Sequence, residues 1–534
     1  MAHERSSLEF LRLLRRYRTT KGPAARPFCL ETRSSKTFII ASCTLAIFTD
    51  CFLYGIVVPV LPFALTERVG IASEDVGLWI AALLACYAGT WLVFAPLAGY
   101  ITDYFTSRRT TFVLALTTLT GATVLIYIGS SIGMLVVGRA LQGVSSALTW
   151  TAGVTLTIET VQEHEVGQTL GICSLGMNLA LLLAPVLGGL LLEQSGYHSV
   201  FAITFALLAL DVTWRLTLIE RSAVNPGQGP PQHVYWTTVF GENGTPRIMP
   251  SPTREDIPNL EPLLVSAERP PLESDIDFED FIVSYRLGEN SVQTISPVRR
   301  DVRESGRRGK IFTQTIIPLM RLLRRPRLVV ALWATFAQTT ITTSLDAVLP
   351  LFVKDKFTWG PQAAGLIFMP IVLPTFWAPF VGAVTDRDGP KWMTSMAFIL
   401  GCPIWILLRL VTHAGVSQSA ILCILLAMVG VTATLATAPL MAEITFAVKS
   451  QNGIARGRFG PRGPIAQAYA LYSFSLAGGL LVGPLWGGLI MELGGWKTMT
   501  WTLSLLSGVT VGPTIFFTGG RLRMADIRWP RARA

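Results

Sequence analysis

The chain has 534 residues, of which 51% are hydrophobic and only 15% are charged, whereas soluble domains carry roughly 25% charged residues. This composition excludes an ordinary soluble protein. The net charge of +10 does not indicate nucleic-acid binding, because nine of the 44 lysines and arginines precede the first apolar segment and sixteen lie between Arg215 and Arg327. Basic residues gathered in a few polar segments are typical of the cytoplasmic side of a membrane protein.

The residue types also argue against an enzyme. The seven cysteines form no Cys-x-x-Cys pair and mostly lie in apolar segments, so they predict neither a metal centre nor a disulfide framework. No cluster of metal ligands and no Ser/His/Asp set stands out in the sequence. We therefore expect no catalytic residue, no metal and no cofactor.

Twelve apolar segments are long enough to cross a bilayer, which takes about 20 residues. They begin near residues 38, 76, 110, 134, 167, 198, 328, 361, 392, 418, 464 and 496. The first should be retained as an anchor, because it is too long for a cleavable signal. The sequence predicts an all-α membrane protein with twelve transmembrane helices in two six-helix pseudo-repeats. Its expected parts are a basic cytoplasmic tail (1–37), an N-terminal bundle (38–219), a disordered cytoplasmic linker (220–327), a C-terminal bundle (328–518) and a second basic cytoplasmic tail (519–534).

The first apolar segment carries one acid, Asp50, near its middle. A charge at that depth costs at least about 2.5 kcal/mol on insertion scales, so such a residue usually faces a cavity or a partner. A low dielectric also makes a carboxyl group hold its proton more tightly. Asp50 is therefore our candidate proton carrier, and the alternative is a protonated acid with a structural role. Pro59 and Pro62 should weaken the helix near its outer end.

A loop motif, Gly-x-x-x-Asp followed by basic residues, comes after both the second and the eighth segments. Its aspartate can accept N–H bonds at the start of a neighbouring helix, and its basic residues can pair with glutamates at adjacent helix ends. Because the motif occurs in both halves, we interpret it as a cytoplasmic gate rather than as ordinary loop charge. The gate candidates are Gly99, Asp103, Arg108, Glu159, Gly382, Asp386, Arg387 and Glu443.

The fourth segment contains Arg139-Ala140-Leu141-Gln142-Gly143. A buried arginine stays charged, so it needs an acid or several acceptors. Arg139 could tune the proton affinity of a nearby carboxyl group, or it could be a structural strut bonded to backbone carbonyls. The sequence leaves both open.

The fifth and eleventh segments share a motif of small residues that ends in Pro-x-x-Gly-Gly, and the repeat of this motif shows that the chain contains two copies of one unit. Small residues four apart let another helix approach closely, and proline bends a helix. We expect a hinge and packing element whose equivalent positions face one another or nearby helices across the pseudo-two-fold axis. The motif residues are Gly171, Pro185, Gly188, Gly189, Gly479, Gly483, Pro484, Gly487 and Gly488.

Three further charged residues lie in apolar segments. Asp211 and Arg215 are four apart in the sixth segment, which favours an internal ion pair over a role in substrate binding. Asp346 in the seventh segment precedes Val348-Leu349-Pro350, a weak echo of Asp50 and the prolines after it. Together, Asp50, Arg139, Gln142 and Asp346 are the candidates for proton or substrate coupling.

These features resemble the major facilitator superfamily. The resemblance rests on six plus six spans, the loop motif in both halves, and Arg139-Ala140-Leu141-Gln142-Gly143. The fifth-span motif looks like that of the 12-helix drug:proton antiporters, with alanine replacing glycine at two positions, Ala180 and Ala184. Asp50 with the prolines after it resembles the first helix of vesicular amine transporters, and the closest similarity is to fungal efflux transporters of that group.

The resemblance implies an antiporter that exports a small amphipathic compound, such as a drug, a toxin or a secondary metabolite, in exchange for protons. Its expected partners are that substrate, protons and the lipid bilayer, with no nucleic acid, and we expect a monomer. The plasma membrane is the expected location, with a vacuolar or vesicular membrane as the alternative, and with termini and linker in the cytosol. The other functional interpretations are a proton symporter or facilitator for a nutrient, and a non-transporting receptor or scaffold.

Overall fold

The computed structural model describes residues 30–72, 75–105, 107–218, 236–240, 246–250, 322–359, 365–452 and 465–519. The predictions for the N-terminal tail before residue 30, for most of the linker and for the tail beyond residue 519 lie outside these residues. The chain divides into two units, Gln232–Gln314 and the rest. The long helices belong to the larger unit.

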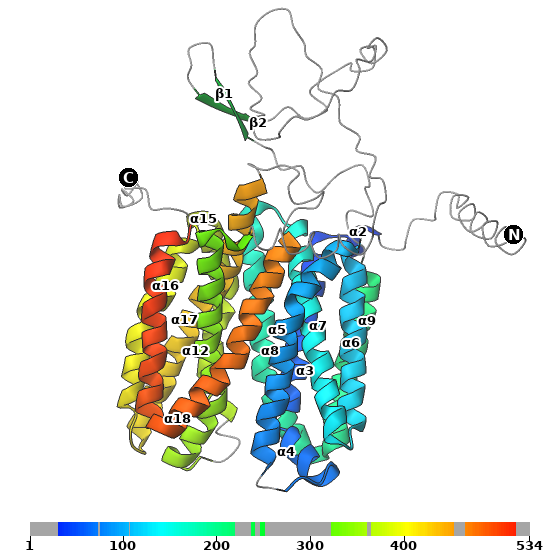
Figure 1. The fold of residues 1–534 in the computed structure, drawn as a ribbon, viewed down its shortest axis with the longest axis vertical. Helices are drawn as coiled ribbons and strands as arrows, with labels where there is room; N and C mark the ends of the chain where they lie inside the picture. The colour runs from blue at the N-terminus through cyan, green and yellow to red at the C-terminus, as the bar shows by residue number, and fades with distance from the viewer. Residues whose placement is uncertain are drawn as a thin grey trace, which may run out of the picture. The chain divides into compact units, whose positions relative to one another are not determined.

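The first repeat contains six long helices that run up and down side by side (Figure 1). Hydroxyl groups cap two of their starts, because Ser35 accepts a hydrogen bond from the Phe38 amide at 3.2 Å and Ser131 accepts one from the Met134 amide at 3.4 Å. The helices are α2 (Leu30–Arg33), α3 (Lys36–Val57), α4 (Leu61–Phe63), the π-helical η1 (Ala64–Arg68), α5 (Val76–Tyr104), α6 (Arg108–Ile128), α7 (Ile132–Thr160), η2 (Glu163–Glu165), α8 (Val166–Ser195) and α9 (Tyr197–Thr217).

The prolines after Asp50 interrupt the first span as predicted. Helix α3 ends at Val57, and the chain continues as the short α4 and one π-helical turn. Proline has no amide hydrogen to donate, so Pro59 and Pro62 cannot continue the helical ladder.

The second repeat follows the same plan, but the eighth span of the chain is irregular. It is broken into α14, η5 and α15, because Pro370, Pro374 and Pro379 each remove a donor from the helical hydrogen-bond ladder. The elements are α12 (Pro326–Phe357), α14 (Met369–Val372), η5 (Leu373–Trp377), α15 (Ala378–Asp388), α16 (Pro390–Leu407), η6 (Leu408–Leu410), α17 (Val416–Asn452) and α18 (Ile465–Phe517).

The predicted count of twelve spans agrees with these elements. Among the described residues, ten helices are long and apolar enough to cross a membrane. One of them, α18, has 53 residues and would be about 80 Å long if straight, against about 30 Å for the hydrocarbon core. Gly495 breaks it with a φ of 72°, which favours glycine, so α18 is the eleventh and twelfth spans in one. The segmented α14–η5–α15 supplies the remaining span.

Within the segment predicted to be a disordered linker, the structure describes one pair of strands. Strand β1 (Trp236–Phe240) pairs antiparallel with β2 (Pro246–Pro250), with Thr238 opposite Ile248. The first strand reads Trp-Thr-Thr-Val-Phe, which are the residue types that favour strands. The membrane part of the chain is nevertheless all α.

The loop motifs lie at one end of the larger unit, which we call the motif end (residues 102–108, 159–167 and 385–391). Figure 1 shows α2 and α15 at this end and α4 at the opposite end. One hydrophobic cluster joins the first repeat to residues near the motif end of the second, including Leu328, Ala442 and Tyr472. A different cluster, around Trp405 and Trp496, fills the opposite half of the second repeat. The two repeats thus share a core mainly in the half of the molecule nearer the motif end.

Candidate functional site

Asp50 lies on α3 in the interior of the first repeat and is 2% exposed. Its Oδ1 accepts a hydrogen bond from the Ser146 hydroxyl of α7 at 2.9 Å, whereas its Oδ2 has no hydrogen-bond partner in the described part of the chain. The Ser146 oxygen lies 3.0 Å from the hydroxyl of Tyr87 on α5. Asp50 is therefore held by a network of hydroxyl groups, and no ion pair of the described residues involves it.

Arg139 does not compensate Asp50. Its Nη1 donates to Gln142 Oε1 at 3.0 Å, and its guanidinium lies 5.8 Å from the ring centre of Tyr54. The Nε and Nη2 atoms have no partner among the described residues, although the side chain is fully buried. Neither sequence interpretation is therefore confirmed, because Arg139 bonds to an amide side chain and a ring instead of an acid or backbone carbonyls. Gln142 also donates to the Leu53 carbonyl at 3.5 Å, which ties α7 to α3.

Asp346 lies on one face of α12 with two other polar residues, Gln338 and Thr342, at four-residue spacing. Exposure rises along this face, from 8% at Gln338 through the partly buried Thr342 to the exposed Asp346. The Asp346 carboxyl group lies near enough to Tyr54 of the first repeat to act on it electrostatically. We call the solvent-accessible region beside Tyr54 and Asp346 the central space; Asp50 is buried away from it.

Aromatic side chains connect the repeats beside this network. The indole N–H of Trp91 on α5 donates to the Ser473 hydroxyl of α18 at 2.7 Å. The ring of Trp150 on α7 lies 6.2 Å from that of Trp91 and 6.3 Å from that of Tyr472 on α18. Because these side chains are almost fully buried, they seal the molecule on the motif-end side of the central space.

At the motif end of the first repeat, Arg108 joins two acids. Its Nη2 donates to Glu159 at 2.8 Å and its Nη1 to Asp103 at 3.2 Å, while a further bond goes to the Thr102 carbonyl. The predicted pairing of this loop motif with Glu159 is confirmed. Asp103 also lies beside Gln467 at the start of α18, so the cluster reaches the second repeat.

The second loop motif contacts the first repeat directly. Asp386 on α15 accepts hydrogen bonds from the Gly167 amide at 2.6 Å and the Gln168 amide at 2.8 Å, in the first turn of α8. This is the predicted contact between an aspartate and a helix start, where unpaired amides and the helix dipole attract an anion. A Cβ atom on Gly382 would overlap the backbone at Gly167, so both glycines are needed for the approach.

The predicted pairing of the second motif's basic residue with Glu443 is wrong. Arg387 is 83% exposed and pairs with its neighbour Asp388 at 3.1 Å, because it lies on the outer side of the last turn of α15. Glu443 is buried and bonded instead to both Nε and Nη2 of Arg327, with 2.9 Å to Nη2, and to the Gly519 amide at 2.9 Å. It therefore joins α17 to the start of α12 and the end of α18.

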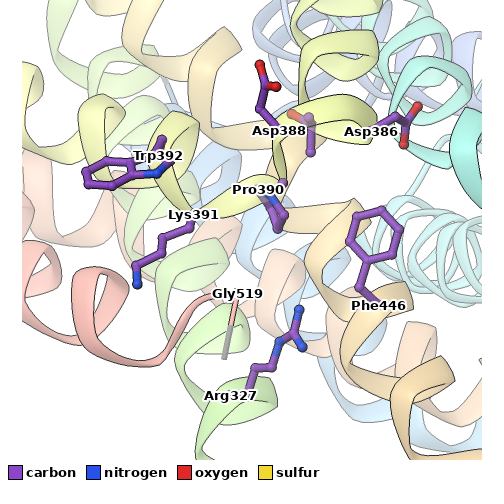
Figure 2. A pocket seen from close by; sticks show the side chains of 10 residues that line it. Arg327, Asp386, Asp388, Pro390, Lys391, Trp392, Phe446 and Gly519 are labelled. Carbon is purple, nitrogen blue, oxygen red and sulfur yellow. The ribbon is translucent and has the colours of Figure 1, made fainter. Parts of the chain in front are cut away.

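A pocket of about 480 Å³ lies beside these contacts at the motif end of the second repeat. In Figure 2, Arg327 and Phe446 line it below Pro390, and the carboxylates of Asp386 and Asp388 point away from the Arg327 guanidinium. Its position beside the Asp386 and Glu443 contacts makes it a part of the gate region, remote from Asp50.

The motif of small residues in α8 and α18 packs mainly within each repeat. Cβ atoms on Gly479, Gly483 and Gly487 would overlap α12, and one on Gly188 would lie 2.8 Å from the Ile56 carbonyl at the end of α3. The prediction of contacts across the pseudo-two-fold axis is wrong for these residues, because the small faces of α8 and α18 pack on the first helix of their own repeat. It is confirmed for Gly171 alone, which faces Ala378 and Pro379 of α15.

Two motif glycines do not carry this packing, because Cβ atoms on Gly189 and Gly488 would meet nothing within 4 Å. Pro185 and Pro484 lie inside α8 and α18 without ending these helices. Among the motif glycines, the close approach is therefore made by one face only.

Several residues of the site were not among the sequence candidates. Ser146, Tyr87, Tyr54 and the Trp91–Ser473 pair are common residue types in apolar segments, and nothing in their spacing marks them. One signal was available, since Ser146 follows Gln142 by four residues and must share its helix face. The described residues hold no cluster of three or more potential metal ligands.

Comparison with known proteins identifies relatives of this chain. A family model described as Major Facilitator Superfamily matches residues 43–460. An MFS-type transporter ppzB of Metarhizium rileyi is 30% identical over 504 residues, covering 93% of this chain and 97% of that protein. The tetracycline resistance protein, class B, of Escherichia coli is 33% identical over 154 residues, covering 29% of this chain and 37% of that protein. The crystal structure of the human organic anion transporter MFSD10 (TETRAN) superimposes with a TM-score of 0.57 at 13% identity, covering 90% of this chain and 99% of that one.

Proposed function

The chain belongs to the major facilitator superfamily, and from this premise we propose that it exchanges protons for a small amphipathic organic compound, which it exports from the cytosol by alternating access. Members of transporter folds with repeated halves place their sites near the bilayer midplane, between the repeats. Asp50 carries the proton, and the central space bordered by Tyr54 and Asp346 receives the substrate.

The state of Asp50 is the observation that carries the proposal. A buried carboxylate without a counter-ion costs several kcal/mol, so this environment favours the protonated form. Within the described residues, Asp50 has one hydroxyl donor, one carboxyl oxygen without a partner and no cation. Such a group releases its proton only when its surroundings change, which is what coupling to a conformational change requires.

The contacts at the motif end supply the second element of alternating access. The Asp386 contact with α8 holds the repeats together there, and the Arg108 cluster lies at the same end. The exposed Asp346 lies in a part of α12 farther from this end. We assign the motif end to the cytosol, since the basic tails and linker adjoin it in sequence. The plasma membrane is the location that suits an exporter.

The proton gradient is large enough for export. One proton entering across about 100 mV gains roughly 2.3 kcal/mol, and one pH unit adds about 1.4 kcal/mol. Together they support a gradient of roughly 500-fold for a neutral compound. The name of the tetracycline resistance protein favours export of this kind over uptake of a nutrient, and the transporter relatives favour transport over a receptor role.

Uptake into reconstituted vesicles with an acidic interior tests the proposal. Wild-type protein should accumulate amphipathic probes such as ethidium or tetracycline until a protonophore collapses the gradient. Asp50→Asn should lose accumulation but keep exchange of labelled for unlabelled probe, because asparagine cannot release a proton. Asp355→Asn, at the exposed end of α12 away from the motif end, is the matched control and should behave as wild type. Full gradient-driven accumulation by Asp50→Asn would contradict the proposed role.

A further inference from the structure

We propose that protons reach Asp50 through a relay of two hydroxyl groups, those of Tyr87 and Ser146, and not by direct contact of its carboxyl group with the central space. This inference rests on the proposed function, because it gives a path to the proton that Asp50 carries.

Burial separates Asp50 from the central space. Asp50 is 2% exposed, Ser146 is 1% exposed and Tyr87 is 3% exposed. Tyr54, which is partly exposed, stacks on Tyr87 with ring centres 4.6 Å apart. A proton from water in the central space must therefore pass the Tyr54–Tyr87 layer before it reaches the carboxyl group.

The hydrogen bonds give the relay a direction. A serine hydroxyl has one proton, which Ser146 can donate to Asp50 Oδ1 at 2.9 Å or to the Gln142 carbonyl at 3.1 Å. The relay uses the shorter of these two bonds, the one to Asp50. The Tyr87 hydroxyl, 3.0 Å from the Ser146 oxygen, must then be the donor in that pair. The three groups form a chain that points from the Tyr54 side toward Asp50.

Proton transfer along this chain leaves no charge on the hydroxyl groups. The Ser146 proton moves to the ionised Asp50 and forms the carboxyl O–H bond. Ser146 takes the phenolic proton of Tyr87, and Tyr87 takes a proton from a hydronium ion in the central space, which becomes water. The Asp346 carboxyl group acts electrostatically on Tyr54, at this entrance. Release of the proton reverses the same steps.

The neighbouring groups offer no equivalent path. Trp150 lies close to the Asp50 carboxyl group, but an indole N–H donates without accepting, so it cannot pass a proton on. Cys51 adjoins Asp50 in sequence but has no hydrogen bond to it, and the donors of Arg139 are directed to Gln142 or lack partners. Among the described residues, the hydroxyl pair is thus the one chain of oxygens that leads to Asp50.

Time-resolved infrared spectroscopy tests the relay without a substrate. A laser flash releases protons from a caged compound, and the carboxyl C=O band that is absent in Asp50→Asn reports protonation of Asp50. Ser146→Ala and Tyr87→Phe should each slow the appearance of this band by roughly tenfold or more, the scale of losing a positioned proton-transfer group. Its final amplitude in acid should remain, and deuterated water should slow the wild type more than it slows the variants.

Matched controls separate the relay from effects on packing. Ser145→Ala removes a hydroxyl that bonds the Ala115 carbonyl at 2.9 Å, and Tyr469→Phe removes a buried phenol that bonds Thr445 at 2.6 Å. Both should protonate Asp50 at the wild-type rate. The double variant Ser146→Ala/Tyr87→Phe should be no slower than either single variant, because one cut breaks the chain.

The outcomes test the hydroxyl relay and the proton-carrying role of Asp50 separately. Wild-type rates in both relay variants, with the Asp50 band intact, would overturn the relay and leave the proton-carrying role in place. A wild-type spectrum without any band that Asp50→Asn removes would show that Asp50 does not exchange its proton, and the proposed function itself would fail.

Discussion

The buried charges of this protein fall into compensated and uncompensated sets. Asp211 and Arg215 on α9 are both fully buried and form a bidentate pair at 2.6 and 2.9 Å, and Arg215 also bonds the Phe112 carbonyl of α6. The predicted ion pair is confirmed. Asp50 and Arg139 lie at comparable depth, and neither forms an ion pair with any described residue. The first pair therefore stabilises the bundle, whereas Asp50 and Arg139 retain unpaired groups that a transport cycle can use.

Replacement by asparagine should lower the unfolding temperature at Asp211 but not at Asp50. Asp211→Asn leaves Arg215 buried without its partner, a change that costs roughly 3–5 kcal/mol, so it should lower the unfolding temperature in detergent clearly. Asp50→Asn replaces a neutral group by a neutral group and should leave the unfolding temperature near that of wild type. Thermal unfolding followed by intrinsic fluorescence checks both variants. Equal losses at the two positions would contradict the distinction.

At the scale of the element, the glycine faces of α8 and α18 decide how the first and seventh spans are held. Thr343 donates to the Gly479 carbonyl at 3.2 Å, and Ser344 donates to the Gly483 carbonyl at 2.9 Å. These bonds between α12 and α18 require the close approach that glycine permits. Since α12 carries Asp346, the packing also positions the wall of the central space.

Leucine substitutions on the packed face and on the open face of α18 test the packing of α18 on α12. A Cβ atom on Gly483 would overlap the Thr343 hydroxyl, so Gly483→Leu should abolish transport of the probe while membrane insertion persists. Gly488→Leu adds the same side chain five residues later, where nothing lies within 4 Å, and should transport normally. Uptake at matched protein levels in vesicles is the measurement. Normal transport by Gly483→Leu would rule out the packing role.

The sequence predicts elements better than contacts between them. Twelve spans, the break after Val57 and the contact of Asp386 with a helix start follow from hydropathy, proline and helix dipoles, which are local properties. The pairing of Glu443 with Arg327 does not, because 116 residues separate them and only the fold makes them neighbours. Tyr87 could not be found for the same reason, since it belongs to the site only through Ser146 and Asp50. For Ser146 the sequence offers only its place on the helix face of Gln142.

At the scale of the whole molecule, two layers join the repeats on one side of the central space. The loop motifs form the outer layer, through Asp386 and the Arg108 cluster, and the aromatic contacts around Trp91 and Tyr472 form the inner one. Export requires both layers to part so that the substrate enters from the cytosol. In this account, the protonation state of Asp50 sets the balance between the closed and open arrangements. Ser146, which bonds Asp50, shares one face of α7 with Trp150, which belongs to the inner layer, so a change at Asp50 is passed to that layer.

The pH dependence of the distance across the motif end shows whether Asp50 controls the closed and open arrangements. Spin labels at Glu163→Cys and Arg387→Cys, in a protein whose seven native cysteines are replaced, report that distance by pulsed electron paramagnetic resonance. In wild type, we predict a short and a long population whose proportions change between acidic and alkaline buffer. With Asp50→Asn added, the proportions should no longer depend on pH. A pH response in Asp50→Asn equal to that of wild type would contradict the account, because protonation elsewhere would then move the repeats.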